Sequence, residues 1–209
     1  MTEDKWTELA ERVLTSSAST TRFAQGHAVC SGTRILRRAT GFAAWKHAGQ
    51  SRKGEGKTPY IHHPIEVTAI LVEVGEVVDL EVLQAALLHD TLEDTQTTAD
   101  ELESLFSVRI RELVLEVSDD KTLHKRERKA LQIEHAPHIS VEAQTIKLAD
   151  KISNVTDVAF ATPIDWPLDR QLEYFDWATR VVAGLRGCNA ALEAYFDQQL
   201  EDSRRKVAG

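Results

Sequence analysis

The feature that most constrains the fold of this chain is a helical spacing of apolar residues that recurs along most of its length. The spacing i, i+3, i+4, i+7, typical of a helix with one buried face, is clear in residues 34–48 at Ile35, Leu36, Ala39, Phe42 and Ala43. Similar periodicity predicts helices over residues 110–117, 125–134, 141–160, 168–185 and 190–202. No stretch shows the alternating pattern of a strand, so we expect an all-α fold.

Three local signals predict further helices and where they begin. Pro64 suits the first turn of a helix, because its fixed φ is helical and its missing N–H has no intrahelical partner there. Thr98 and Glu101 have the spacing of a capping box. Residues 80–88 form a nearly continuous apolar run, whose length and Ala and Leu content favour a buried helix over a strand.

The chain length fits one domain, preceded by a segment of different composition. The 209 residues are enough for one sizeable core. Residues 3–14 have weak helical spacing, and residues 15–32 are rich in Ser, Thr and Ala, which is typical of a linker. We therefore expect an N-terminal extension or linker over residues 1–32 and one main domain over residues 33–209.

Charge and cysteine content exclude several classes of function. A formal net charge of −8 argues against nucleic-acid and anionic-membrane binding, which need a broad basic surface, but it leaves small anionic ligands possible. The only two cysteines, Cys30 and Cys188, form no zinc-binding or disulfide pattern. No signal peptide or run of about 18 apolar residues is present, so we expect a cytoplasmic protein.

Four side chains have the chemistry of ligands for a divalent metal ion: His63, His89, Asp90 and Asp150. His89 and Asp90 follow the apolar run of residues 80–88, which places both at the rim of a core. Taken alone, an adjacent His-Asp pair in a chain with eight histidines is most often surface or capping chemistry. Asp150 strengthens the metal interpretation, because a carboxylate in an apolar helical stretch needs a partner.

Polar residues share one face of the predicted helix over residues 141–160. Lys147, Asp150 and Asn154 lie at i, i+3 and i+7, so they point the same way. A solvated face with an intrahelical ion pair explains this spacing equally well. A basic, glycine-rich segment over residues 49–59, which contains Arg52 and Lys53, stands out in an otherwise acidic chain.

The motifs around these residues resemble the hydrolase domain of the RelA/SpoT family, most closely its small, hydrolase-only members. They are Tyr-Ile-His-His-Pro at 60–64, Ala-Leu-Leu-His-Asp-Thr-Leu-Glu-Asp-Thr at 86–95 and Lys-Leu-Ala-Asp-Lys at 147–151, supported by residues 119–122 and 173–177. The resemblance spans roughly residues 34–200. It implies an HD-domain helical bundle that holds Mn²⁺ through the four ligands and hydrolyses guanosine 3′,5′-bis(diphosphate), or its triphosphate analogue, to GDP or GTP and pyrophosphate.

The resemblance also assigns roles to residues beyond the metal ligands. It implies that Glu93 and Asp94 are catalytic, which fits a carboxylate that orients or deprotonates water beside a metal. It implies substrate contacts for the residues Arg52, Lys53, Asn154, Arg170 and Tyr174. His62 is expected to be structural or solvent-facing, because the family's ligand directly precedes the proline.

One departure from the family leaves the choice of substrate open. Thr156 replaces an arginine found in many relatives, so we expect a phosphate contact to be missing. One alternative is a phosphohydrolase of the same fold that acts on another nucleotide, for example an NADPH 2′-phosphatase. Another is a non-catalytic regulatory domain that binds a nucleotide, although retention of all four ligands and both acids argues against it.

Overall fold

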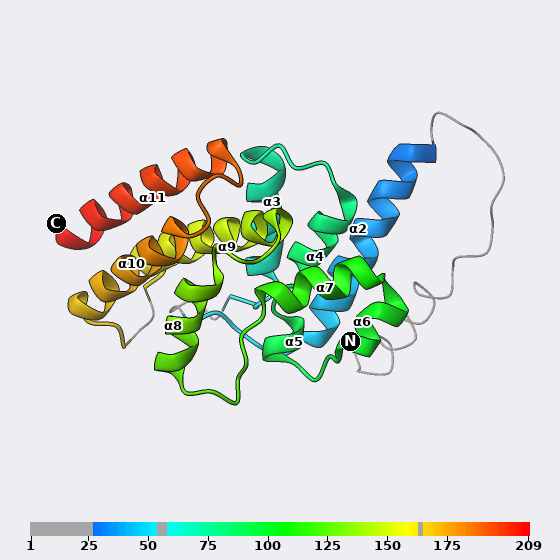
Figure 1. Ribbon diagram of the computed structural model, residues 1–209, viewed down its shortest axis with the longest axis horizontal. Coiled ribbons are helices and arrows are strands. Elements are labelled where there is room, and N and C mark those ends of the chain that lie inside the picture. The colour runs from blue at the N-terminus through cyan, green and yellow to red at the C-terminus, as the bar shows by residue number, and fades with distance from the viewer. Residues whose placement is uncertain (1–26, 54–57, 163–164) are drawn as a thin grey trace.

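The computed structural model describes residues 27–53, 58–162 and 165–209 and shows a bundle of helices (Figure 1). The helices are α2 (His27–Lys46), α3 (His62–Glu73), α4 (Leu80–Leu88), α5 (Thr91–Asp94), α6 (Ala99–Leu105), α7 (Val108–Val117), α8 (Lys125–His135), α9 (Val141–Phe160), α10 (Leu168–Ala183) and α11 (Ala190–Ala208). The described residues contain no strand, and an isolated antiparallel bridge joins Ser51 and Pro59. The all-α prediction is therefore confirmed.

Helix α9 is the central element of the bundle. It packs against α3, α4, α7, α10 and α11, and in Figure 1 it lies across the middle, with α10 and α11 toward one end and α2, α6 and α7 toward the other. Ile146, Leu148, Ile152 and Val155 are at most 1% exposed. A helix whose apolar residues point in several directions must be covered on several sides. This burial holds the backbone of Asp150, whose side chain is partly exposed, at a fixed place beside the core.

Side-chain caps fix the starts of the helices that lead to the site. Asp79 caps α4 by accepting hydrogen bonds from the backbone N–H groups of Glu81 (2.9 Å) and Val82 (3.4 Å). The hydroxyl of Thr98 accepts one from the N–H of Glu101 at the start of α6 (3.1 Å). In a full capping box, the carboxylate of Glu101 would also accept from the backbone N–H of Thr98. Here that carboxylate forms an ion pair with Lys46 of α2 instead.

Several element bounds differ from the sequence-based expectation. Helix α2 begins at His27, so the expected boundary near residue 33 falls inside a helix. The short helix α5 was not predicted, and α11 continues to Ala208. The possible helix over residues 3–14 lies outside the described residues. None of the described helices is both long and apolar enough to cross a membrane.

Candidate active site

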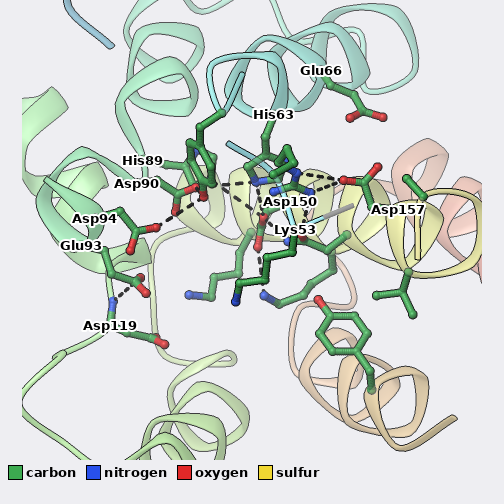
Figure 2. Close-up of a pocket in the computed structure, with 18 of the residues that line it drawn as sticks. Lys53, His63, Glu66, His89, Asp90, Glu93, Asp94, Asp119, Asp150 and Asp157 are labelled. Atoms are coloured by element: carbon green, nitrogen blue, oxygen red, sulfur yellow. Dashed lines mark hydrogen bonds and ion pairs between the residues drawn. The ribbon is translucent and has the colours of Figure 1, made fainter. Parts of the chain in front are cut away.

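A cavity of about 1030 Å³ opens between the start of α3, the α4–α5 junction, α8, α9 and α10. All four predicted metal ligands line it, as do Glu93 and Asp94, and Figure 2 shows these acidic side chains gathered on one side. Of the predicted substrate residues, four line the cavity: Arg52, Lys53, Asn154 and Tyr174. The fold therefore brings together residues as distant in the sequence as Arg52 and Tyr174.

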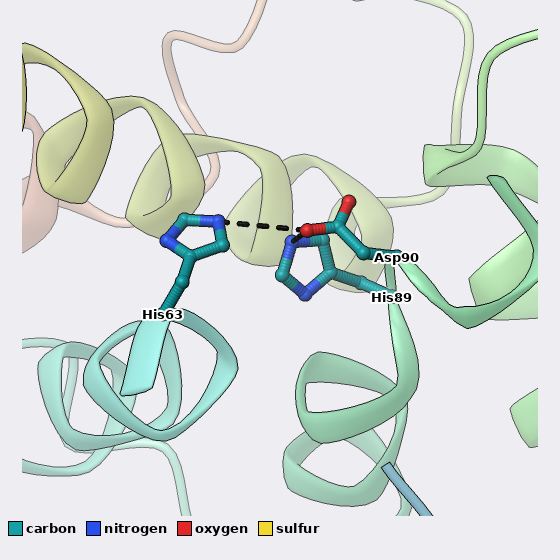
Figure 3. A group of neighbouring side chains, drawn as sticks. All are labelled: His63, His89 and Asp90. Atoms are coloured by element: carbon teal, nitrogen blue, oxygen red, sulfur yellow. Dashed lines mark ion pairs between the residues drawn. The ribbon is translucent and has the colours of Figure 1, made fainter. Parts of the chain in front are cut away.

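The predicted ligands converge from two helices and one junction. His63 lies in the first turn of α3, His89 and Asp90 form the α4–α5 junction, and Asp150 projects from α9 (Figures 2 and 3). Ligand atoms of His63, His89 and Asp90 all lie within 4.8 Å of one another. Asp150 Oδ1 is 3.1 Å from His63 Nε2 and 3.8 Å from His89 Nε2.

Hydrogen bonds on the far side of each imidazole leave its Nε2 atom free to act as a ligand. His89 Nδ1 lies 2.7 Å from the carbonyl oxygen of Ala86, which can only accept, so Nδ1 carries the hydrogen. His63 Nδ1 lies 3.1 Å from Ser153 Oγ, and that hydroxyl donates to Glu66 (3.0 Å), so it accepts from the imidazole. Each neutral ring then presents a lone pair at Nε2.

The buried Nε2 atom of His89 indicates that these residues fit a metal ion. It has no hydrogen-bond partner in the described part of the chain, although Asp90 Oδ2 lies 3.0 Å away. Burial alone lowers the pKa of His89, but the charges of Asp90 and Asp150 outweigh burial and raise it to about 9. The carboxylates thus favour a positive charge at this point, which a divalent ion supplies.

Glu93 and Asp94 lie on the single turn of α5, directly after the ligand pair. Glu93 accepts a hydrogen bond from the backbone N–H of Asp119 (3.1 Å), and its other oxygen is 3.0 Å from Lys121 Nζ. Burial, followed by the charges of Asp119 and Asp90, raises the pKa of Glu93. A carboxylate with a raised pKa is suited to accept a proton near neutral pH.

Tyr60 is a site residue that our sequence reasoning missed. Its hydroxyl donates to Asp90 Oδ2 (2.6 Å) and lies 3.4 Å from Asp94 Oδ2, so it joins a predicted metal ligand to the predicted catalytic pair. Its ring stacks on His47 with the centroids 4.7 Å apart. The sequence shows only that Tyr60 lies three residues before His63, and this spacing does not predict a contact with Asp90.

The predicted substrate residues divide into two groups. Arg52 is already bound to acceptors of α9: its Nη2 donates to Asn154 Oδ1 (3.2 Å) and its Nε to Asp157 (2.9 Å), and Asn154 in turn donates to the ligand Asp150 (2.6 Å). Lys53 is exposed beside the cavity. Arg52 therefore links the basic segment to the predicted metal ligands, whereas the exposed side chain of Lys53 is accessible to a ligand.

The aromatic side of the cavity comes from α10 and the residues before it. Tyr174 packs against Trp166 and Trp177 at centroid distances of 5.7 and 5.2 Å, and burial raises its pKa to about 12. Arg170 does not line the cavity; its guanidinium lies 4.4 Å from the ring centroid of Trp166, which does. Arg170 therefore contacts the aromatic wall without lining the cavity, and its role in substrate binding stays a prediction.

Two sequence expectations concern neighbours of the site. Thr156 does not line the cavity; its hydroxyl donates to the carbonyl of Ile152 (3.0 Å) and lies 3.4 Å from Gln199 of α11. Thr156 therefore does not reach the cavity, and the loss of a phosphate contact at this position stays a prediction. His62 is exposed at the cavity rim, in agreement with a solvent-facing role.

A row of cations from α8 and α9 lines the cavity beside the acids, where Arg128 lies 3.5 Å from Glu93 and Lys151 lies 2.9 Å from Asp150. Lys125, Arg128 and Lys129 come from α8 and Lys151 from α9. Burial, and then the charges of Arg170 and Lys53, lower the pKa of Lys125. The sequence analysis did not select these residues, although the basic start of α8 was visible. Together they give an acidic protein a local anion-binding wall.

Comparison with known proteins places these features in a family. Residues 39–167, more than half of the chain, match the HD domain family. Proteins named guanosine-3′,5′-bis(diphosphate) 3′-pyrophosphohydrolase MESH1 are 52% identical in Danio rerio, covering 81% of this chain and 94% of the relative, and 54% identical in Homo sapiens, covering 76% and 88%. The bifunctional (p)ppGpp synthase/hydrolase SpoT of Escherichia coli is 38% identical over 135 residues, or 61% of this chain and 18% of SpoT.

A solved structure gives the same result at the level of the fold. The structure of a metazoan orthologue of SpoT, described as hydrolysing ppGpp, has a TM-score of 0.78 and 42% identity, covering 88% of this chain and 98% of its own. The HD-domain bundle predicted from the motifs is therefore confirmed. The chain belongs to the HD domain family and, within it, to the group of MESH1 hydrolases.

Proposed function

We propose that this chain is a metal-dependent hydrolase of guanosine 3′,5′-bis(diphosphate), which it converts to GDP and pyrophosphate, and of the triphosphate analogue, which it converts to GTP and pyrophosphate. The relatives described above carry this activity in their names. The observation that carries the proposal is the cavity itself, because it combines a His/His/Asp/Asp cluster, two further carboxylates and a cationic wall. We assign the activity to residues 33–209, leave residues 1–32 outside the catalytic domain, and expect a cytoplasmic location.

The residues His63, His89, Asp90 and Asp150 would hold the ion, which we propose to be Mn²⁺. Imidazole nitrogen and carboxylate oxygen suit Mn²⁺ among the hard and borderline divalent metals. When bound, the ion lowers the pKa of water and neutralises charge that develops on phosphoryl oxygens. The hydrogen bonds that His63 Nδ1 donates to Ser153 and that His89 Nδ1 donates to the carbonyl of Ala86 fix the orientation of the two rings in advance.

In the proposed reaction, the carboxylates of the cavity transfer protons and its cations bind the substrate. Glu93, assisted by Asp94, accepts a proton as water attacks the phosphorus atom bonded to the ribose 3′ oxygen. The bond between that phosphorus and the 3′ oxygen breaks, the oxygen gains a proton, and pyrophosphate leaves. The cations from α8 and α9, with Lys53, bind the phosphates, and the aromatic pair Trp166 and Tyr174 offers a stacking surface for the base.

A panel of nucleotides tests this proposal. The protein is stripped of metal, reloaded with Mn²⁺, Mg²⁺ or Zn²⁺, and incubated with guanosine 3′,5′-bis(diphosphate), its triphosphate analogue or NADPH. We expect GDP or GTP with pyrophosphate, fastest with Mn²⁺. Faster release of orthophosphate from NADPH would replace the proposed substrate, and nucleotide binding without turnover would support a regulatory role.

A further inference from the structure

Lys147 of α9 is a buried lysine that the proposed chemistry does not use. Its side chain is 8% exposed, and its ammonium donates to the carbonyl oxygen of Val117 (2.8 Å). Among the described residues it forms no ion pair within 4.0 Å. Burying an ammonium group without a carboxylate partner is costly, so a lysine at this position needs a reason other than packing.

The carbonyl that Lys147 binds begins a short segment that holds Glu93. Val117 is the last residue of α7, and two residues later the backbone N–H of Asp119 donates to Glu93 Oε2 (3.1 Å; Figure 2). The carboxylate of Asp119 is held by Gln132 Nε2 of α8 at 2.8 and 2.7 Å. Residues 117–119 are thus attached to α9, to α8 and to the proposed base.

We propose that Lys147 is a positioning residue for Glu93 and acts through the backbone of residues 117–119. A hydrogen bond to the carbonyl of Val117 fixes the plane of the peptide between residues 117 and 118, because peptide groups are planar. Only φ and ψ of Ser118 separate that plane from the Asp119 N–H, and Ser118 is itself held by the bond from its hydroxyl to the carbonyl of Val114 (2.7 Å). That N–H donates to the carboxylate of Glu93. Misplacement of a reacting group by about 1 Å costs about 10²-fold in rate, so the contact of Lys147 has a catalytic consequence.

This inference rests on the proposed role of Glu93, and a double-mutant cycle tests both separately. Lys147→Met removes the donor at similar length. We expect a kcat at least about tenfold lower, with metal content unchanged and KM within about twofold. In the Glu93→Gln background, Lys147→Met should lower the single-turnover rate by less than about threefold. The residue that Lys147 positions no longer acts as a base there.

Lys46→Met is the matched control, because Lys46 is a largely buried lysine whose ammonium contacts Glu101 at 2.8 Å, away from the cavity. We expect it to lower the melting temperature comparably and to leave kcat unchanged. The inference would be overturned if Lys147→Met lowered the catalytic rate equally in the wild-type and Glu93→Gln backgrounds, or lowered it in neither. A Glu93→Gln enzyme with wild-type kcat would instead refute the proposed base.

A second variant covers the case in which Lys147→Met does not fold. Lys147→Arg keeps the charge, but its longer side chain must displace the carbonyl of Val117 in order to fit. A loss of kcat that is absent in the Glu93→Gln background supports the inference. An equal loss in both backgrounds, or none in either, would overturn it.

Discussion

Replacing Glu93 by glutamine separates proton transfer from metal binding. Gln keeps the size of the side chain and an oxygen that can still accept from the N–H of Asp119, which is 3.1 Å away in the native protein. It cannot accept the proton from water. We expect kcat to fall by about 10²-fold or more, the usual scale for losing a general base, which corresponds to about 2.7 kcal/mol in the barrier.

The same substitution should leave the fold almost as stable as before. It removes the ion pair between Glu93 and Lys121, whose side chain is 44% exposed, and such a pair contributes about 0.2–1 kcal/mol. It also removes a buried charge that burial, Asp119 and Asp90 disfavour, as the raised pKa of Glu93 shows. The two effects oppose each other, so the melting temperature should change by about 3 °C or less.

Three measurements on the same preparation decide the outcome. Elemental analysis should still find about one metal ion per chain, because Glu93 is not among the residues whose ligand atoms cluster. Differential scanning calorimetry gives the melting temperature, and steady-state kinetics gives kcat. If the variant loses the ion, Glu93 is a ligand; if it turns over at the wild-type rate, Glu93 is a bystander. Either result refutes the mechanism.

Three further predictions address other parts of the site. Ser153→Ala removes the hydroxyl that orients the imidazole of His63, so isothermal titration should show metal affinity weakened about 10–100-fold. An unchanged metal affinity would contradict this role. Arg52→Ala with Lys53→Ala should raise KM about tenfold or more without changing metal content, and an unchanged KM at low ionic strength would refute a role in binding. Lys121 lowers the pKa of Glu93, so Lys121→Met should move the acid limb of the kcat profile to higher pH, and a shift to lower pH would contradict the assignment of the base.

The long helices could be predicted from sequence because their apolar periodicity is strong. The bounds of α4 and α9 agree with residues 80–88 and 141–160, since continuous burial leaves a clear pattern. Helix α5 has a single turn and no apolar period of its own, so nothing in its sequence distinguishes it from a loop. The start of α2 at His27 was missed because the Ser and Thr content there favours a linker.

Only those site residues that belong to the family motifs could be predicted from the sequence. The resemblance supplied His63 and Asp150, which lie 87 positions apart and which no spacing rule would join. Contacts made by the tertiary fold were not accessible in this way. Tyr60 and Lys147 both act on backbone or carboxylate groups distant in sequence, and their partners are decided by how α7, α9 and the α4–α5 junction pack together.

The position of bond cleavage tests the central claim most directly. The metal-loaded protein is incubated with guanosine 3′,5′-bis(diphosphate) in water enriched in ¹⁸O, and both products are analysed by mass spectrometry. Attack on the phosphorus bonded to the ribose 3′ oxygen predicts one ¹⁸O atom in pyrophosphate and none in GDP. Label in GDP, or release of labelled orthophosphate in place of pyrophosphate, would contradict the account.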